Sequence, residues 1–349
     1  MKKLFSLIFC LFVLSGAVAL HSQEGKDYTV MFYNVENLFD IYDDPTVADE
    51  EFTPDGPKDW TEHKYREKIS HIGQVIFDIA KANASYPAVI GVSEVENRRV
   101  LDDLVSVPDL LRANYQIVHY DSPEARGIDV ALIYRPDIFK YEWSKPIRPV
   151  IPEWPDFRTR DILAVFGTID GEEFCFFVNH WSSRRGGSHA SEYLRCGCAA
   201  TLKHFTDSLS AVHPDVKIVI MGDMNDDPDD RSLTEVLGGK AKPELVQDGE
   251  FFNPFISMHK AGYGTLGYQD AWNLFDNILV SKTLLEDGGD GQLRIRKAGK
   301  GKYYGNIFRR PYLIQQKGKF KNYPFRTFSG NTYLGGYSDH LPVYILIGK

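Results

Sequence analysis

The stretch that decides the fold is Lys217-Ile-Val-Ile-Met-Gly-Asp-Met-Asn-Asp226. The residues from Ile218 to Gly222 are mostly β-branched or apolar and stop at a glycine, which predicts a short buried strand. Asp223 and Asn225 follow directly, and residues two apart in an extended chain point to the same side. We therefore expect a carboxylate and a carboxamide to emerge side by side at a strand end, where open sheets place their sites.

The same arrangement recurs elsewhere, because other apolar strands also end in side chains that can bind a metal ion or a phosphate. Taken singly, each has an ordinary explanation, such as a turn hydrogen bond or an ion pair between Glu94 and Arg98. Six such ends, none with a cysteine, instead favour a hard ion with oxygen ligands: Mg²⁺, Mn²⁺ or Ca²⁺. These ends carry Asn34 and Glu36, Glu94, Asn179 and His180, Asp223 and Asn225, Asp276 and Asn277, and Ser338-Asp339-His340.

The rest of the chain predicts more strands than helices, without a strict alternation of the two. Helical spacing of apolar residues predicts helices from about 61 to 79, from 97 to 105 and from 191 to 209. This pattern favours an α/β (α+β) fold of two packed sheets with outer helices over one doubly wound sheet. Further strands are expected at 28–34, 88–92, 115–119, 128–134, 163–169, 174–179, 274–280 and 341–347.

Length and composition predict one large domain behind a leader. The chain has 349 residues, of which 43% are hydrophobic, and a formal net charge of -8. Residues 1–19 have a charged start, an apolar run from Leu4 to Leu14 and a small-residue cleavage site at Ala17-Val18-Ala19, which predicts a signal peptide. We therefore expect a secreted or periplasmic protein, with residues 20–349 as a single catalytic domain. The mature chain should contain no integral membrane segment; an uncleaved anchor is the alternative.

Three cysteines follow the leader, namely Cys175, Cys196 and Cys198. This number is too small for a disulfide framework, and a bridge between Cys196 and Cys198 would be strained. At most one bridge, involving Cys175, is expected. No histidine lies at a zinc-site spacing from these thiols, so a zinc site is not predicted.

Seven stretches carry a family resemblance, in one order along nearly the whole mature chain. They are Phe32-Tyr-Asn-Val-Glu-Asn-Leu-Phe-Asp40, Gly91-Val-Ser-Glu-Val-Glu-Asn97, Arg126-Gly-Ile-Asp-Val-Ala-Leu-Ile-Tyr-Arg135, Asn179-His-Trp-Ser-Ser-Arg-Arg-Gly-Gly187, Gly222-Asp-Met-Asn-Asp226, Phe275-Asp-Asn-Ile-Leu-Val-Ser281 and Gly336-Tyr-Ser-Asp-His-Leu-Pro-Val343. Together they resemble the endonuclease/exonuclease/phosphatase superfamily of DNase I-like phosphodiesterases, in its secreted bacterial nuclease-like branch. The resemblance implies a four-layer α/β/β/α sandwich of two mixed sheets, with the site at one edge.

The resemblance also implies a metal site and a catalytic set. The metal-site residues are Asn34, Glu36, Glu94 and Asp339. The chain departs from many members at Asn277, where an aromatic residue or histidine is usual, and Glu36 is the longer of the two carboxylates found at its position. Both departures leave the number and preference of metal ions open.

The implied catalytic residues are His180, Asp223, Asn225, Asp276 and His340. Asp223 would activate or orient the attacking water, and Asn225 would contact the phosphate. Asp276 would hold His340 in one tautomer, so that His340 can carry a proton or a positive charge at the phosphate. His180 matches the second histidine of nuclease-type members.

Between Arg294 and Arg326 the chain has eleven lysines or arginines and no acidic residue, with aromatic residues interleaved. Basic residues contact phosphates and aromatic rings stack on bases, so this stretch favours a nucleic-acid substrate. The alternative is a solvated loop that its aromatic residues anchor to the core. We expect only one of the adjacent Arg184 and Arg185 to face the site. The candidate substrate contacts are Arg126, Arg184, Arg185, Arg309, Arg310 and Arg326.

These observations predict a secreted, divalent-metal-dependent phosphodiester hydrolase, an endonuclease that acts on DNA or RNA. The alternative within the same chemistry is a phosphatase or phospholipase-type phosphodiesterase that acts on phosphoinositides, sphingomyelin or small phosphoesters. An anionic lipid headgroup would suit the basic stretch as well. A third possibility is a non-catalytic binding module on the same fold.

Overall fold

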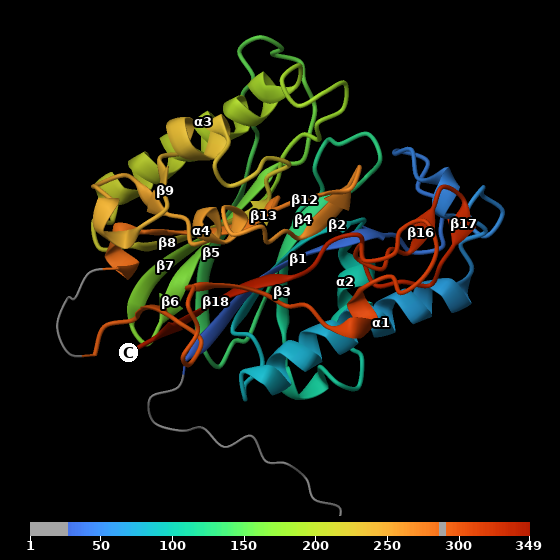
Figure 1. Cartoon of the computed structure of the whole chain (residues 1–349), viewed down its shortest axis with the longest axis horizontal. Helices are drawn as coiled ribbons and strands as arrows, with labels where there is room; N and C mark the ends of the chain where they lie inside the picture. The colour runs from blue at the N-terminus through green and yellow to red at the C-terminus, as the bar shows by residue number, and fades with distance from the viewer. Residues whose placement is uncertain (1–26, 286–290) are drawn as a thin grey trace, which may run out of the picture.

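Two large mixed sheets lie face to face in the middle of the molecule (Figure 1). The computed structural model describes residues 27–285 and 291–349, so the expected signal peptide lies outside the described residues. The first sheet has the order β14-β18-β1-β2-β4-β3, with β15 also paired to β18. Its strands are β1 (Tyr28–Leu38), β2 (Val89–Val95), β3 (Gln116–His119), β4 (Asp129–Tyr134), β14 (Arg294–Arg296), β15 (Gly305–Ile307) and β18 (Val343–Gly348).

The second sheet has the order β5-β6-β7-β8-β13-β10-β9. Its strands are β5 (Phe139–Ile147), β6 (Ile162–Ile169), β7 (Glu172–His180), β8 (Lys217–Asp223), β9 (Gly239–Lys240), β10 (Phe251–Phe252) and β13 (Asp276–Ser281). Two small hairpins project from the sheets: β11 (Leu266–Tyr268) with β12 (Ala271–Asn273), and β16 (Phe328–Ser329) with β17 (Thr332–Tyr333).

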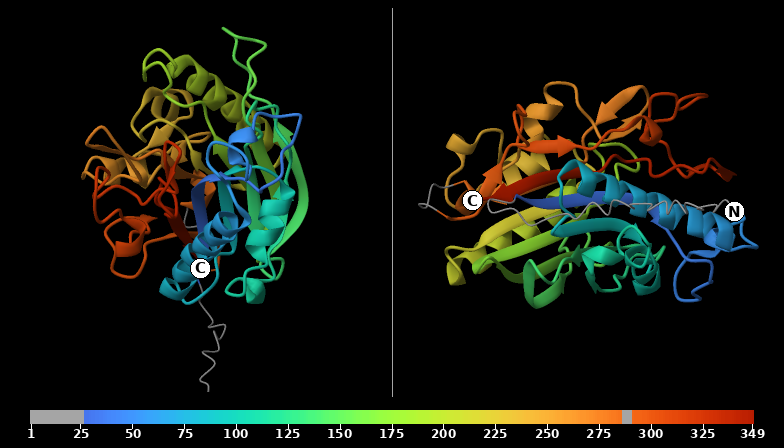
Figure 2. Two further views of the ribbon diagram at one scale, coloured as in Figure 1. Left: turned by 90° about the vertical axis from the view of Figure 1, so that its right-hand side faces the viewer. Right: turned by 90° about the horizontal axis from the view of Figure 1, so that it is seen from below.

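Helices cover the outer faces of the two sheets, which makes four layers (Figure 2). Helices α1 (Glu62–Ala82) and α2 (Arg98–Val105) pack on the first sheet, and α3 (Glu192–Val212) packs on the second. The short α4 (Phe255–His259) contributes to the core between the sheets. The fold predicted from the sequence is confirmed, and it is a DNase I-like sandwich.

The alternation of side chains along the central strands explains why they are apolar throughout. In β1, Val30 and Phe32 lie in the core between the sheets, whereas Met31 and Tyr33 lie in the core beneath α1. A strand that is covered on both faces needs apolar residues at every position. Asn34, near the carboxyl end of the strand, is buried but belongs to neither core.

One edge of α1 is joined by hydrogen bonds to the segment 312–337. Tyr312, Tyr333 and Tyr337 each donate a hydroxyl hydrogen bond to a side chain of the helix, at 2.6–3.1 Å. Lys68 and His71 contact backbone carbonyls of the same segment. This set of contacts, the α1 seam, holds the chain that leads directly into Ser338-Asp339-His340. Its helix residues are Glu67, Lys68, His71, Gln74 and Asp78.

Several local expectations can be compared with the structure. The Asn97 side chain accepts a hydrogen bond from the Val100 amide and caps α2, as the helix expected there requires. Cys175, Cys196 and Cys198 are free thiols, so the bridge that the sequence allowed does not form. The strand expected at 274–280 begins instead at Asp276. Within residues 27–285 and 291–349, none of the helices has the length and apolarity to cross a bilayer.

Candidate active site

The polar strand ends meet at one edge because of how the strands pair. β1 and β2 are parallel, as are β7 and β8, so their carboxyl ends share an edge within each sheet. β13 runs antiparallel to β8 and places Asp276 opposite Asp223. β18 runs antiparallel to β1, so the residues that precede β18 lie beside the end of β1. The directions of the strands therefore bring site residues as far apart in sequence as Asn34 and His340 to one edge.

Two hydrogen bonds between side chains cross from one sheet to the other at this edge. Asn34 Nδ2 at the end of β1 donates to Asp223 Oδ2 at the end of β8, at 2.9 Å. His340 Nδ1, just before β18, lies 2.7 Å from Asp276 Oδ2 at the start of β13. All four residues are buried. The site therefore belongs to neither sheet alone.

Asp223 lies between two histidines. Its Oδ2 is 3.7 Å from His180 Nε2 and 3.7 Å from His340 Nε2. Burial raises the pKa of Asp223 to about 6, which Asp276 increases and the charge of His340 opposes. A carboxylate with a pKa near neutral can accept a proton from water at the operating pH.

The two histidines differ in charge. Burial opposes protonation of His340, but the carboxylates of Asp276 and Asp223 outweigh it and raise its pKa well above the usual value. Burial lowers the pKa of His180 well below the usual value, and the charge of Arg160 adds to this effect. The site therefore contains one protonated and one neutral imidazole on either side of Asp223.

Asn225 follows Asp223 in a left-handed conformation, with φ of 49°. Its backbone amide donates to Asp223 Oδ1 at 2.9 Å, and its Nδ2 donates to the Trp181 carbonyl at 3.0 Å. The turn thus fixes both oxygens of Asp223, since Asn34 holds the other. Because Asn225 is not extended, its side chain does not have to point to the same side as that of Asp223, as the alternation along a strand would require.

The metal-ligand side of the site is formed around Glu94. This residue has φ of 63° at a register shift between β2 and β4, and such bulges redirect side chains. Its Oε1 lies 3.3 Å from Asn34 Nδ2 and 3.8 Å from His180 Nε2, and its Oε2 accepts from the Asn37 amide at 2.9 Å. The Glu94 side chain is 17% exposed, so solvent ions can reach it.

Hard oxygen donors at this edge suit a divalent cation. Asp223 and Asp276 offer carboxylate oxygens within 4.8 Å of each other, whereas the protonated His340 beside them has no lone pair for a cation. Asp276 Oδ1 is buried and has no hydrogen-bond partner in the described part of the chain. Glu94 and Asp339 add partly exposed carboxylates at the rim. The donor set therefore fits a Mg²⁺-type ion.

Glu36 faces away from this group. A register shift between β1 and β2 and φ of 50° at Glu36 turn its carboxylate toward the α1 seam. Glu36 Oε2 accepts from the Thr327 amide at 2.7 Å and lies 3.8 Å from Lys68 Nζ. Burial raises the pKa of Glu36 to about 7, with a further contribution from the charge of Asp339.

Two functional neighbours were not predicted from the sequence. Lys68 is buried on the core-facing side of α1, where Tyr65, Ile69 and Ile72 surround it in helical spacing. Arg160 is also buried and donates to the carbonyls of His180 and Trp181, at 3.1 and 2.5 Å. The sequence does indicate that Lys68 is buried, because it stands among apolar residues at helical spacing. Arg160 lies in an irregular segment, where no such pattern indicates burial.

The arginines proposed as substrate contacts lie in different environments. Arg326 lies 3.4 Å from Asp339 and stacks over Phe320, so it borders the site. Arg309 stacks over Trp272 and is exposed. Arg310 stacks over Phe308 and is exposed as well.

Of the other three arginines, Arg126 and Arg184 are held by ion pairs, whereas Arg185 is exposed. Arg126 pairs with Glu124 at 3.0 Å, and its charge lowers the pKa of His180, which places it near the site. Arg184 bonds to the Asn225 carbonyl at 2.9 Å and also pairs with three carboxylates of the loop after β8: Asp226, Asp227 and Asp230. Arg185 beside it is exposed. Arg184 thus braces the turn that carries Asn225.

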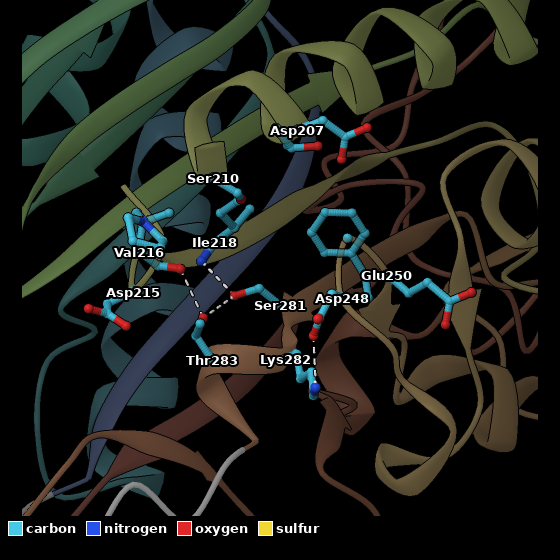
Figure 3. Close-up of a pocket in the computed structure, with 14 residues that line it drawn as sticks. Asp207, Ser210, Asp215, Val216, Ile218, Asp248, Glu250, Ser281, Lys282 and Thr283 are labelled. Atoms are coloured by element: carbon cyan, nitrogen blue, oxygen red, sulfur yellow. Dashed lines mark hydrogen bonds and ion pairs between the residues drawn. The ribbon is translucent and has the colours of Figure 1, made fainter. Parts of the chain in front are cut away.

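A pocket of about 360 Å³ lies at the other end of β8, beside Val216 and Ile218 (Figure 3). Three of its carboxylates are paired with lysines: Asp248 with Lys282 at 2.8 Å, Glu250 with Lys240 at 3.0 Å, and Asp207 with Lys203. Strand β8 is seven residues long, so roughly 20 Å separates this pocket from Asp223. The pocket is therefore not part of the candidate site.

Comparisons with known proteins agree with this geometry. The model of the Endonuclease/Exonuclease/phosphatase family matches residues 29–349. No curated protein matches the chain. Among solved structures, truncated TDP2 from Caenorhabditis elegans has a TM-score of 0.56 at 15% identity, covering 94% of this chain and 100% of that chain.

Two further structures show the same fold. TDP2 from D. rerio, complexed with a single-strand DNA product, has a TM-score of 0.53 at 12% identity over 93% of this chain and 99% of that chain. An endonuclease/exonuclease/phosphatase family protein from Bacteroides thetaiotaomicron has a TM-score of 0.53 at 16% identity over 93% and 98%. At such identities the likeness shows the fold. The match over residues 29–349 shows that the chain belongs to the endonuclease/exonuclease/phosphatase family, whose members are metal-dependent phosphoester hydrolases.

Proposed function

We propose that the protein is a divalent-metal-dependent phosphodiesterase that cleaves DNA or RNA outside the cytoplasm. The observation that carries the proposal is the pair of contacts between the sheets, Asn34 to Asp223 and His340 to Asp276. A binding module would not need this buried acid-base arrangement. Export is proposed from the leader at residues 1–19 alone, and N-terminal sequencing of the exported protein should begin at residue 20.

The residues suggest a hydrolytic sequence of events. Asp223 accepts a proton from a water whose oxygen attacks phosphorus, and the bond from phosphorus to the leaving oxygen breaks. Protonated His340, oriented by Asp276, donates a hydrogen bond to a phosphate oxygen on which negative charge develops. Glu94, Asn34 and Asp339 would hold the divalent ion, which supplies positive charge to stabilise the phosphate oxygens. The leaving oxygen takes up a proton from solvent water, Asp223 later releases its proton to solvent, and the products are a terminal phosphate and a free hydroxyl.

The surroundings of His340 support a nucleic-acid substrate. Leu266 of β11 forms a bridge with His340, so the β11–β12 hairpin lies directly beside the site. This hairpin carries Trp272, over which Arg309 stacks at 4.8 Å. An exposed arginine over a half-buried aromatic ring next to a phosphate site suits a chain of bases and phosphates. The DNA-complexed TDP2 from D. rerio shares the fold.

The test is a cleavage assay on plasmid DNA, single-stranded RNA, a synthetic phosphodiester, and vesicles that contain sphingomyelin or phosphoinositide. Each substrate is incubated with Mg²⁺, Mn²⁺, Ca²⁺ or chelator. We expect cleavage of nucleic acid that chelator abolishes, and a loss of about 10³-fold in Asp223→Asn and Glu94→Gln. Asp229→Asn is the matched control, because Asp229 lies in the same loop but is exposed and bound to His259.

Different results would overturn different parts of the proposal. Hydrolysis of lipid alone would identify the phospholipase-type alternative. Binding of nucleic acid without cleavage under any metal would identify a non-catalytic module. Full activity in Asp223→Asn would remove Asp223 from the reaction.

A further inference from the structure

Lys68 is a buried charge beside the site that the proposed mechanism does not use. It lies on α1 with a relative exposure of 1%, among the apolar residues that pack the helix on the first sheet. A buried ammonium group is costly unless it is paired and hydrogen-bonded. The contacts of Lys68 should therefore show what it does.

All contacts of the Lys68 ammonium lie at the end of the α1 seam nearest the site. Nζ donates to Thr327 Oγ1 at 2.5 Å and to the Tyr337 carbonyl at 2.7 Å, and it lies 3.8 Å from Glu36 Oε2. Glu36 in turn accepts from the Thr327 amide at 2.7 Å. Lys68, Glu36 and Thr327 thus form a closed, buried group, and Tyr337 leads into Asp339.

This group occupies one oxygen of the Glu36 carboxylate and places a positive charge beside it. Glu36 Oε2 already faces an amide donor and an ammonium. A divalent cation bound there would be close to the positive charge of Lys68 and would be repelled in a poorly solvated place. Glu94, in contrast, has no lysine or arginine within ion-pair distance in the described ranges, and its side chain reaches solvent.

We infer that Lys68 is a built-in cation for Glu36, so that the centre takes one divalent ion on the Glu94 side and Glu36 is not a metal ligand. The inference rests on the proposed function, which places a divalent ion at Glu94. Lys68 and Glu36 are then positioning residues. Through Thr327 and Tyr337 they hold the segment that carries Asp339 and His340.

The test measures binding of Mn²⁺ alone by isothermal titration calorimetry, with no substrate. We expect one ion per wild-type chain. Glu36→Gln should still bind one ion, with an affinity within about threefold of wild type. Glu94→Gln should lose at least 30-fold in affinity. Glu67→Gln is the matched control from the same seam and should bind as wild type.

Removal of the positive charge of Lys68 should create a second Mn²⁺ site at the Glu36 carboxylate. Lys68→Gln keeps a donor for Thr327 but frees the Glu36 carboxylate, and we expect a second, weaker Mn²⁺ site in this variant. The double variant Lys68→Gln/Glu36→Gln should return to one ion. If Lys68→Gln does not fold, as judged by circular dichroism, the Glu36→Gln measurement decides alone.

The outcomes separate the two proposals. Two ions in wild type, one ion in Lys68→Gln, or a large loss of affinity in Glu36→Gln would overturn the role of Lys68 while leaving a metal enzyme. No Mn²⁺ binding by wild type would overturn the proposed function and this inference together.

Discussion

At the scale of single residues, the orientation of His340 depends on one carboxylate. Asp276 is fully buried, and its Oδ2 holds His340 Nδ1 at 2.7 Å, which turns Nε2 toward Asp223. In the described ranges no second side chain hydrogen-bonds to the His340 imidazole; the backbone amide of His340 donates to Ser338 Oγ at 3.0 Å. Without the Asp276 carboxylate, the imidazole of His340 should no longer be held in one tautomer, and its protonated form should be less favoured.

Asp276→Asn should accordingly lower kcat by about 10²- to 10⁴-fold, the range seen when a carboxylate that orients a catalytic histidine becomes an amide. KM should change little, because Asp276 does not face solvent. The measurement is steady-state cleavage of a short oligonucleotide. Glu173→Gln is the matched control, since Glu173 also binds a histidine, with its Oε2 at 3.1 Å from His213 Nδ1, but lies at the start of β7, the end of the strand opposite His180. A kcat for Asp276→Asn within threefold of wild type would contradict the prediction.

The residues that sequence reasoning could bring together are those that follow directly from strand ends. Asn34, Glu94, Asp223 and His340 each follow or precede an apolar run, and strand pairing gathers them. The helical pattern indicated that Lys68 is buried, but its role could not be assigned in this way, because neither Lys68 in α1 nor its partner Thr327 lies at the end of a strand.

The left-handed turns caused a second kind of error. Residues two apart were expected to point the same way, but Glu36 and Asn225 have positive φ values of 50° and 49°. Glu36 therefore faces Lys68 while Asn34 faces Asp223. Non-glycine residues rarely adopt this conformation, and a periodic pattern contains no information about it.

At the scale of elements, α1 does more than cover a sheet, because its seam anchors the chain that precedes His340. His71 stacks on Tyr337 with ring centroids 4.3 Å apart, and its Nδ1 lies 3.3 Å from the Gly336 carbonyl. Burial lowers the pKa of His71, and the Gly336 carbonyl only partly opposes this. The folded protein thus keeps this imidazole neutral at a pH where the unfolded chain takes up a proton.

The sign of the effect on stability follows from this difference. As pH falls below about 6.5, the unfolded state binds the proton first, so the free energy of unfolding should decrease. His71→Phe keeps the stacked ring and removes the proton, so its unfolding free energy should fall less between pH 7 and pH 5. Urea unfolding at several pH values measures this. His63→Phe, on an exposed position of the same helix, is the control, and an identical pH dependence in wild type and His71→Phe would contradict the prediction.

Strand β5 is an element that the sequence pattern does not predict. It lies at the edge of the second sheet, has several exposed residues, and contains Pro146. A proline and charged residues are ordinary on an edge strand but weaken the pattern used to predict strands. The buried strands β7 and β8, in contrast, were predicted to within about two residues at each end.

At the scale of the whole molecule, charge is distributed unevenly. The net charge is -8, yet residues 294–326 contain eleven basic residues and no acidic ones. Arg309 and Arg326 from this stretch lie near the site over aromatic rings, which holds their charge in place. An anionic polymer should therefore approach from this side, with an affinity that falls as salt rises.

Arg309→Ala should weaken binding and reduce the slope of log Kd against log salt by about 0.7 to 0.9, the value for one lost phosphate contact. Binding can be measured without turnover in an Asp223→Asn background, with a fluorescent single-stranded oligonucleotide. Arg112→Ala, exposed on the 3₁₀ turn after α2, is the control. An unchanged slope for Arg309→Ala would place the substrate elsewhere.

Strand β18 has a consequence for how the protein is made. It pairs with β1 through Tyr28 and Ile347 and separates β1 from β14, so the first strand of the fold has the last as its neighbour. A nascent chain on the ribosome cannot complete this sheet until residues 343–348 have been translated, because contacts so far apart in sequence form late. Newly synthesised protein therefore lacks the pairing of β1 with β18, and with it the placement of His340 beside Asp223, until β18 has left the ribosome.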